Sequence, residues 1–196
     1  MGKGRLEAFS DGVLAIIITI MVLELRTPHE ATLAALRTLV PVLLSYALSY
    51  VFVGIYWNNH HHLLAASRHV DGKILWANLH LLFWLSLVPF TTRWMGESRF
   101  APLPVATYGV VLLLAALAYS LLTRALIARH GDDSTLAAAI GVDRKGWFSI
   151  MLYVAGIAVA FFYPRIAGAL YCIVALIWLT PDPRIERRLR ASEKTE

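Results

Sequence analysis

The sequence is poor in charged residues and in cysteine, and both shortages limit what the chain can be. Only 16% of its 196 residues are charged, whereas 58% are hydrophobic, and the mean hydropathy is +0.62. Such a chain has too little polar surface to cover a soluble domain. Cys172 is the single cysteine, which excludes an intrachain disulfide, a CxxC pair and a thiolate metal cluster. The composition indicates an integral membrane protein.

The sequence also lacks a long polar linker. We expect one membrane domain over 1–182 and a short basic cytoplasmic tail at 183–196. In a soluble protein the formal net charge of +5 would suggest nucleic-acid binding. Here the basic residues cluster beside apolar segments, as topology signals do. No nucleic-acid partner is expected, and the lipid bilayer is the expected surrounding.

The apolar segments predict an all-α polytopic membrane protein with six transmembrane helices. These segments lie at about 6–25, 33–57, 74–90, 103–127, 147–162 and 166–179. Pro164 falls in the short connection between the last two segments, and proline suits the first turn of a helix. We therefore expect the fifth and sixth helices to form a tight hairpin.

Lysine and arginine are distributed unevenly between alternate connections. Most of the 18 basic residues fall at the ends and connections that would share one side of the membrane with both termini. The positive-inside rule predicts that this side is the cytoplasm. We expect a multi-pass protein of the cell membrane, in a bacterium the inner membrane, with both termini cytoplasmic.

The first apolar segment carries a stripe of large aliphatic residues. At 100° per residue, Ile16, Ile20 and Leu23 share one face of a helix, and Thr19 lies on its flank. A stripe of this kind ordinarily faces lipid or a packing partner. It becomes a pore wall only where several such helices surround water, and the residues alone leave both interpretations open.

Ser10 and Asp11 bring polarity to the start of the same segment. A carboxylate costs on the order of 3 kcal/mol at the centre of a membrane helix and less near its end. Asp11 lies about 140° around the helix from Ile16, which directs it toward neighbouring helices. The second and third segments supply polar partners: Trp57, Asn58, Asn59, His60, His61, Asn78 and His80. We expect a structural hydrogen-bond network among the first three helices.

The histidine run at 60–62 raises other classes of protein. Adjacent histidines project about 100° apart on a helix, and no carboxylate or cysteine recurs around them at ligand spacing. No nucleophile, base and orienting residue form a catalytic set. We expect no tightly bound metal, no cofactor and no enzymatic activity. The alternatives are a proton-coupled or solute transporter that uses a buried Asp11 and the histidines, a membrane metalloenzyme and an assembly protein.

Several short motifs, in order, resemble those of one family. Arg5, Phe9, Ser10 and Asp11 form an RxxxFSD pattern at the start of the first segment. YWNNHH follows at 56–61, LWANL at 75–79 and LVPF at 87–90. Together they resemble the motifs of the transmembrane protein 175 potassium channel family in its single-repeat prokaryotic form.

This resemblance implies a homotetrameric cation channel whose pore is lined by the first helix of each subunit. Ile16 aligns with the family's hydrophobic constriction and Leu23 with a further apolar ring, while Thr19 would add a ring of hydroxyls. Ala15 stands where some relatives have serine. The TVGYG filter of ordinary potassium channels does not occur in the sequence.

The implied mechanism is a gate that closes by dewetting. Four Ile16 side chains would exclude water from a narrow bore, and a small helix movement would rewet it. K⁺ and other monovalent cations would bind transiently near Ile16 and Thr19, with modest selectivity for K⁺. Glu24, near the outer end, either concentrates cations or is an ordinary solvated carboxylate at a helix end.

Overall fold

The computed structural model describes residues 2–67, 69–130 and 144–179, and these residues form helices and connecting turns only. The helices are α1 Lys3–Leu23, α2 Leu33–Thr38, α3 Val40–Ala65, α4 Gly72–Ser86, α5 Val88–Glu97, α6 Pro102–His130, α8 Arg144–Ala160 and α9 Pro164–Leu179. The predicted all-α class is confirmed. The expected basic tail at 183–196 lies outside the described residues.

Within the described residues, four helical segments are long and apolar enough to cross a bilayer: Lys3–Leu23, Val40–Ala65, Gly72–Glu97 and Pro102–Arg129. They correspond to the first four predicted spans. α8 and α9 are shorter, with 17 and 16 residues, or about 24–26 Å at 1.5 Å per residue. Their crossing of the membrane stays a prediction, and so does the total of six spans.

Proline divides the third span into α4 and α5 and separates α2 from α3 in the second. Pro89 has no N–H to bond the carbonyl four residues earlier, so the helix is interrupted at Leu87. The Leu87 N–H instead bonds the Trp84 carbonyl at 3.2 Å, in a tighter turn. Pro41 stands in the same position after the break that ends α2. Pro164 begins α9, as its sequence position predicted.

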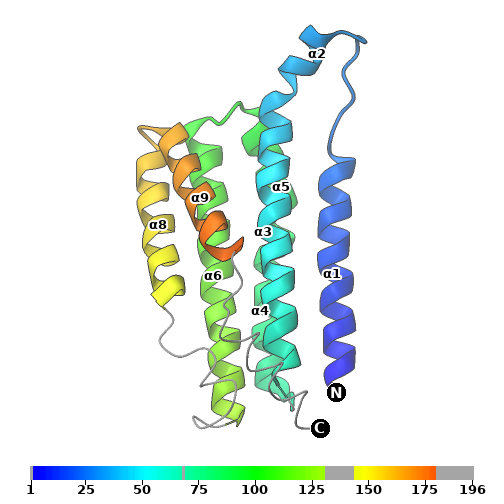
Figure 1. Cartoon of the computed structure of the whole chain (residues 1–196), viewed down its shortest axis with the longest axis vertical. Helices are drawn as coiled ribbons and strands as arrows, with labels where there is room; N and C mark the ends of the chain where they lie inside the picture. Colours follow the sequence, from blue (N-terminus) through cyan, green and yellow to red (C-terminus); the bar gives the residue numbers. More distant parts are fainter. Residues whose placement is uncertain (1, 68, 131–143, 180–196) are drawn as a thin grey trace.

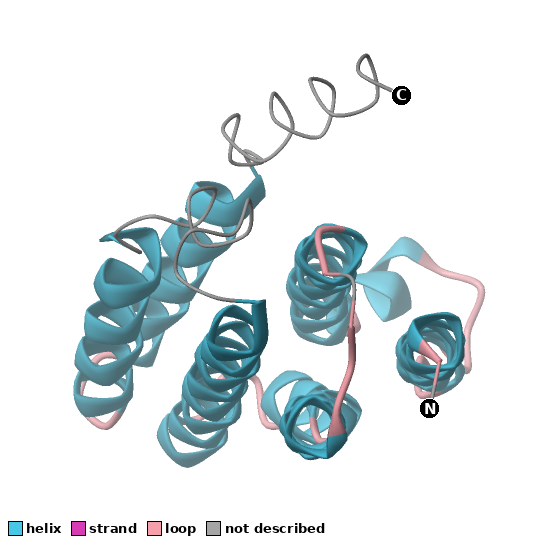
Figure 2. Cartoon of the chain, turned by 90° about the horizontal axis from the view of Figure 1, so that it is seen from below, coloured by secondary structure: helices cyan, strands magenta, loops and turns pink. Residues whose placement is uncertain are grey.

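The helices form an antiparallel bundle in which α1 lies at one side. α1 contacts α3, α4 and α5, whereas α8 and α9 pack against α6 on the opposite side (Figure 1). Figure 2, which looks along the bundle, shows that α1 and α8 lie far apart. Because its neighbours cover only one side of α1, much of this helix is left uncovered by the rest of the chain.

Candidate functional site

The uncovered face of α1 carries the stripe of large aliphatic residues. Ile16 is 57% exposed, Ile20 is 41% exposed and Leu23 is 81% exposed, although each is strongly apolar. On the opposite face, Leu14 and Ile17 are almost completely buried against the rest of the bundle. One helix therefore presents two apolar faces, of which only one has a partner within the chain.

Thr19 adds a polar group to this uncovered face. Its hydroxyl donates to the Ile16 carbonyl at 2.8 Å, within the same helix. Since the hydroxyl hydrogen is used by the backbone, the oxygen lone pairs remain available on the exposed side. Thr19 therefore offers an acceptor that suits a cation, three residues from Ile16.

The opposite face of α1 begins with a buried hydrogen-bond network that joins three helices. Asn78 Nδ2 on α4 donates to Ser10 Oγ at 2.9 Å, and Ser10 Oγ donates to the Leu6 carbonyl at 2.8 Å. His60 Nε2 on α3 donates to Asn78 Oδ1 at 2.7 Å. All three side chains are buried, so each is expensive to leave unpaired. This network fixes the rotation of α1 about its axis and thereby decides which face is uncovered.

Asp11 lies beside this network but is exposed in the single chain, where the sequence suggested a buried carboxylate. Trp57 Nε1 on α3 donates to Asp11 Oδ1 at 3.0 Å. The ring of His61 stacks on Trp57, with 6.3 Å between the ring centroids. Asp11 and His61 thus form a more exposed rim to the same α1–α3 contact.

The remaining residues of the predicted network lie elsewhere. His80 is exposed on α4 and accepts a hydrogen bond from Trp84 Nε1 of its own helix at 2.9 Å, so it does not join the other helices. Arg5 and Phe9 are exposed on α1. They lie within about 20° of Ile16 around the helix and extend the uncovered stripe toward the N-terminus.

Glu24, just beyond α1, is part of an ion-pair cluster. Its Oε2 lies 3.1 Å from Arg93 Nη1 on α5, and Arg93 Nε in turn lies 3.1 Å from Glu97 Oε1. Arg26 reaches the same Glu97 oxygen at 4.0 Å. The sequence offered Glu24 as a cation concentrator or a solvated carboxylate, and the structure shows an ion pair instead. No local pattern in the sequence indicates this pair, because Glu24 and Arg93 are far apart in the chain.

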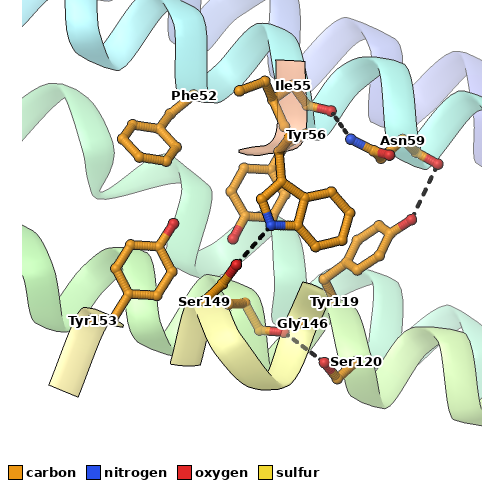
Figure 3. Close-up of a pocket in the computed structure, with 11 residues that line it drawn as sticks. Phe52, Ile55, Tyr56, Asn59, Tyr119, Ser120, Gly146, Ser149 and Tyr153 are labelled. Carbon is orange, nitrogen blue, oxygen red and sulfur yellow. Dashed lines mark hydrogen bonds between the residues drawn. The ribbon is translucent and has the colours of Figure 1, made fainter. Parts of the chain in front are cut away.

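A second candidate is a small aromatic cavity among α3, α6, α8 and α9 (Figure 3). Its volume is about 40 Å³, and its walls include Tyr56, Tyr119 and Tyr153. Tyr119 donates to the Asn59 carbonyl at 3.2 Å, and Trp178 Nε1 donates to Ser149 Oγ at 2.8 Å. This volume suits one or two water molecules and is too small for a substrate.

No three of the His, Cys, Asp and Glu side chains in the described part of the chain come together as a metal site. The uncovered face of α1, which includes Thr19, is therefore the stronger candidate for the functional site.

Comparison with known proteins agrees with this geometry. The family model for the endosomal/lysosomal potassium channel TMEM175 matches residues 5–89, which span α1 to the start of α5. A Chryseobacterium protein described as potassium channel HX13_20290 is 57% identical over 190 residues, which cover 97% of this chain and 99% of that one. The chain belongs to the TMEM175 potassium channel family. The resemblance predicted from its sequence motifs is confirmed.

Other members of the TMEM175 family share less sequence. A Streptomyces collinus potassium channel is 34% identical over 61% of this chain and 62% of its own length. The crystal structure of a lysosomal potassium-selective channel TMEM175 homologue from Chamaesiphon minutus superimposes with a TM-score of 0.80 at 26% identity. That match covers 92% of this chain and 97% of the homologue. The chain is therefore a multi-pass membrane protein with a TMEM175 channel fold, and it is not an enzyme.

Proposed function

We propose that this chain forms a homotetrameric, K⁺-permeable cation channel in which α1 of each subunit lines the pore. The observation that carries the proposal is the exposure of Ile16, Ile20 and Leu23 on a face that the chain itself leaves uncovered. A single subunit with one such helix cannot enclose a pore, so several copies are required. The membership of the chain in a potassium channel family supports ions as the transported species.

In the proposed pore, Ile16 forms the gate. Four isoleucine side chains around one axis make a ring without hydrogen-bonding groups, where a narrow bore loses its water and an ion would lose its hydration. The buried Ser10–Asn78–His60 network holds the other face of α1. Gating therefore requires a rotation or splaying of α1 that either carries this network along or breaks it.

Selectivity in this proposal is modest, because the chain contains no TVGYG carbonyl filter. Preference for K⁺ over Na⁺ arises from the lower cost of dehydrating K⁺ and from the width of the bore. The Thr19 oxygen, whose hydrogen is used by the Ile16 carbonyl, replaces part of the lost hydration. We further propose six membrane crossings per subunit with both termini in the cytoplasm.

The proposal is tested by ion flux from proteoliposomes with a K⁺ gradient. Ile16→Asn hydrates the ring and is expected to raise K⁺ flux above that of the wild type. Ile173→Asn is the matched control, because Ile173 is 42% exposed on α9, at the other side of the bundle. An equal rise in both variants would overturn the assignment of the pore face. Absence of flux in wild type and Ile16→Asn alike would overturn the channel.

A further inference from the structure

Residues of α4, α6 and α8 line a wide groove. Figure 2 shows α6 and α8 on the part of the bundle away from α1. Its volume is about 580 Å³, which is in the range of sites that hold small organic ligands. Residues of all three helices line it, among them His80 of α4, Leu121 of α6 and Trp147 of α8. In the proposed channel α1 faces the pore, and we place this groove on the side of the subunit that faces lipid.

The lining of the groove changes along its length. Leu117, Leu121 and Arg124 lie on one face of α6 at spacings of four and three residues, and Ile150 of α8 lies opposite. Leu121 is 50% exposed and Trp147 is 64% exposed, so these walls are open to the surroundings. The groove is thus mainly apolar toward the middle of the bundle, with Ser120 as a polar member, and it has Arg124 and Trp147 in its lining toward the end at which α1 begins.

Arg124 is a cation without a counterion in the described part of the chain. Arg129, five residues further along α6, does have a counterion: its Nε lies 3.8 Å from Asp71 Oδ2. No described carboxylate lies within 4.0 Å of Arg124, and its side chain is exposed. An arginine prefers a bidentate oxyanion such as a phosphate.

The depth of this cation matches that of a lipid phosphate. Arg124 lies about 12 Å along the axis from the middle residue of the 29-residue helix α6, and the hydrocarbon core reaches about 15 Å from the bilayer centre. A long arginine side chain extends over the remaining distance to the headgroups. Trp147, near the start of α8, is placed as the tryptophans of membrane interfaces are.

We propose that this groove binds one anionic phospholipid. Arg124 binds its phosphate, Trp147 lies at the level of its glycerol, and an acyl chain lies along Leu117, Leu121 and Ile150. The positive charge of Arg124 complements the negative headgroup of this lipid. A second copy of the chain in the groove would instead bury Arg124 without a counterion. The placement of the groove toward lipid rests on the proposed function, whereas the test below measures no ion flux.

The test uses the full-length protein in vesicles of phosphatidylcholine and phosphatidylglycerol, with bromine on the acyl chains of one lipid or the other. Bromine quenches tryptophan fluorescence on contact, and the signal of Trp147 is the difference between wild type and Trp147→Phe. We expect brominated phosphatidylglycerol to quench this signal more than brominated phosphatidylcholine does. Arg124→Gln should remove the excess, and Arg165→Gln, which removes the same charge at the other end of the bundle, should keep it.

Two results would overturn the proposal. Equal quenching by the two lipids in the wild type would show ordinary bilayer contact without headgroup selection. No quenching of Trp147 by either lipid would show that protein covers the groove, as a second copy of the chain would. Both results need only the wild type and Trp147→Phe, so they stand even if Arg124→Gln does not fold. Failure of the channel proposal is read separately, from ion flux.

Discussion

Asn78 on α4 donates its amide hydrogen to the Ser10 hydroxyl on α1, across 68 positions of sequence and a distance of 2.9 Å. Both side chains are fully buried, and His60 of α3 completes the group by donating to Asn78 Oδ1. The pair connects the rotation of α1 to the body of the bundle. It therefore determines that Ile16 lies on the uncovered side and Ile17 on the packed side.

The first prediction concerns the stability of this network. Ser10→Ala leaves the Asn78 amide without its acceptor in a buried site, which should lower the free energy of unfolding by about 1–2 kcal/mol. Ser86→Ala is the matched control, because the Ser86 hydroxyl bonds only the Phe83 carbonyl of its own helix and is exposed. Thermal unfolding in detergent measures both variants. Equal melting temperatures for the two variants would show that the network does not stabilise the fold.

A second prediction follows from the close approach of α3 and α5 at Gly96. A Cβ atom built on Gly96 would lie 2.5 Å from Ser45 Oγ and 2.8 Å from Val42 Cα, which is backbone and cannot move aside cheaply. Gly96→Ala should therefore separate the two helices and lower the melting temperature. Gly54→Ala on α3, with nothing within 4 Å of its Cβ position, should be neutral or stabilising by up to about 1 kcal/mol. A tolerated Gly96→Ala would contradict this packing.

The ion pair at the C-terminal end of α1 leads to a third prediction. Glu24 and Arg93 are partly exposed, so their interaction should contribute less than about 1 kcal/mol and weaken in high salt. In a double-mutant cycle, Glu24→Gln and Arg93→Gln should therefore destabilise the protein by less together than the sum of their separate effects. Thermal unfolding at low and high salt measures the cycle. Strict additivity at low salt would mean that the pair does not form in solution.

A fourth prediction uses Asp11 to distinguish the channel hypothesis from the transporter hypothesis. In the structure Asp11 accepts a hydrogen bond from Trp57, and the amide oxygen of Asp11→Asn can accept the same bond. We therefore expect Asp11→Asn to retain K⁺ flux, with the same dependence on pH as the wild type. A proton-coupled transporter that titrates Asp11 would instead lose its pH-dependent flux in this variant.

Much of the fold can be predicted from two local properties of the sequence, the length of its apolar segments and the positions of its prolines. The four long apolar helices and the start of α9 at Pro164 were predicted because hydrophobic length and proline act locally. The division of the third span at Leu87 was not predicted, since a proline near the end of an apolar run either kinks a helix or divides it.

In the candidate site, too, the sequence predicted the local features but not the contacts between helices. Helical periodicity placed Ile16, Ile20 and Leu23 on one face, and the structure exposes all three. Periodicity does not reveal which polar residues of other helices meet α1. His80 was expected in the network with Asn78, yet it points elsewhere on α4, because two residues along a helix differ by about 200°. Glu24 and Arg93 likewise meet only because the chain folds α1 against α5, which no local pattern predicts.

If α1 lines the pore, its uncovered face is in contact with water, and the accessibility of a cysteine on that face measures this contact. Leu23→Cys, in a chain that carries Cys172→Ser, places a thiol at the C-terminal end of this face. Leu103→Cys on α6 is the control, because Leu103 is 55% exposed at the same end of the bundle. A water-soluble cationic thiosulfonate should block the current through Leu23→Cys channels and leave Leu103→Cys channels unaffected. An unblocked current through Leu23→Cys channels, with the thiol unmodified, would place this face in lipid and exclude it as the pore wall.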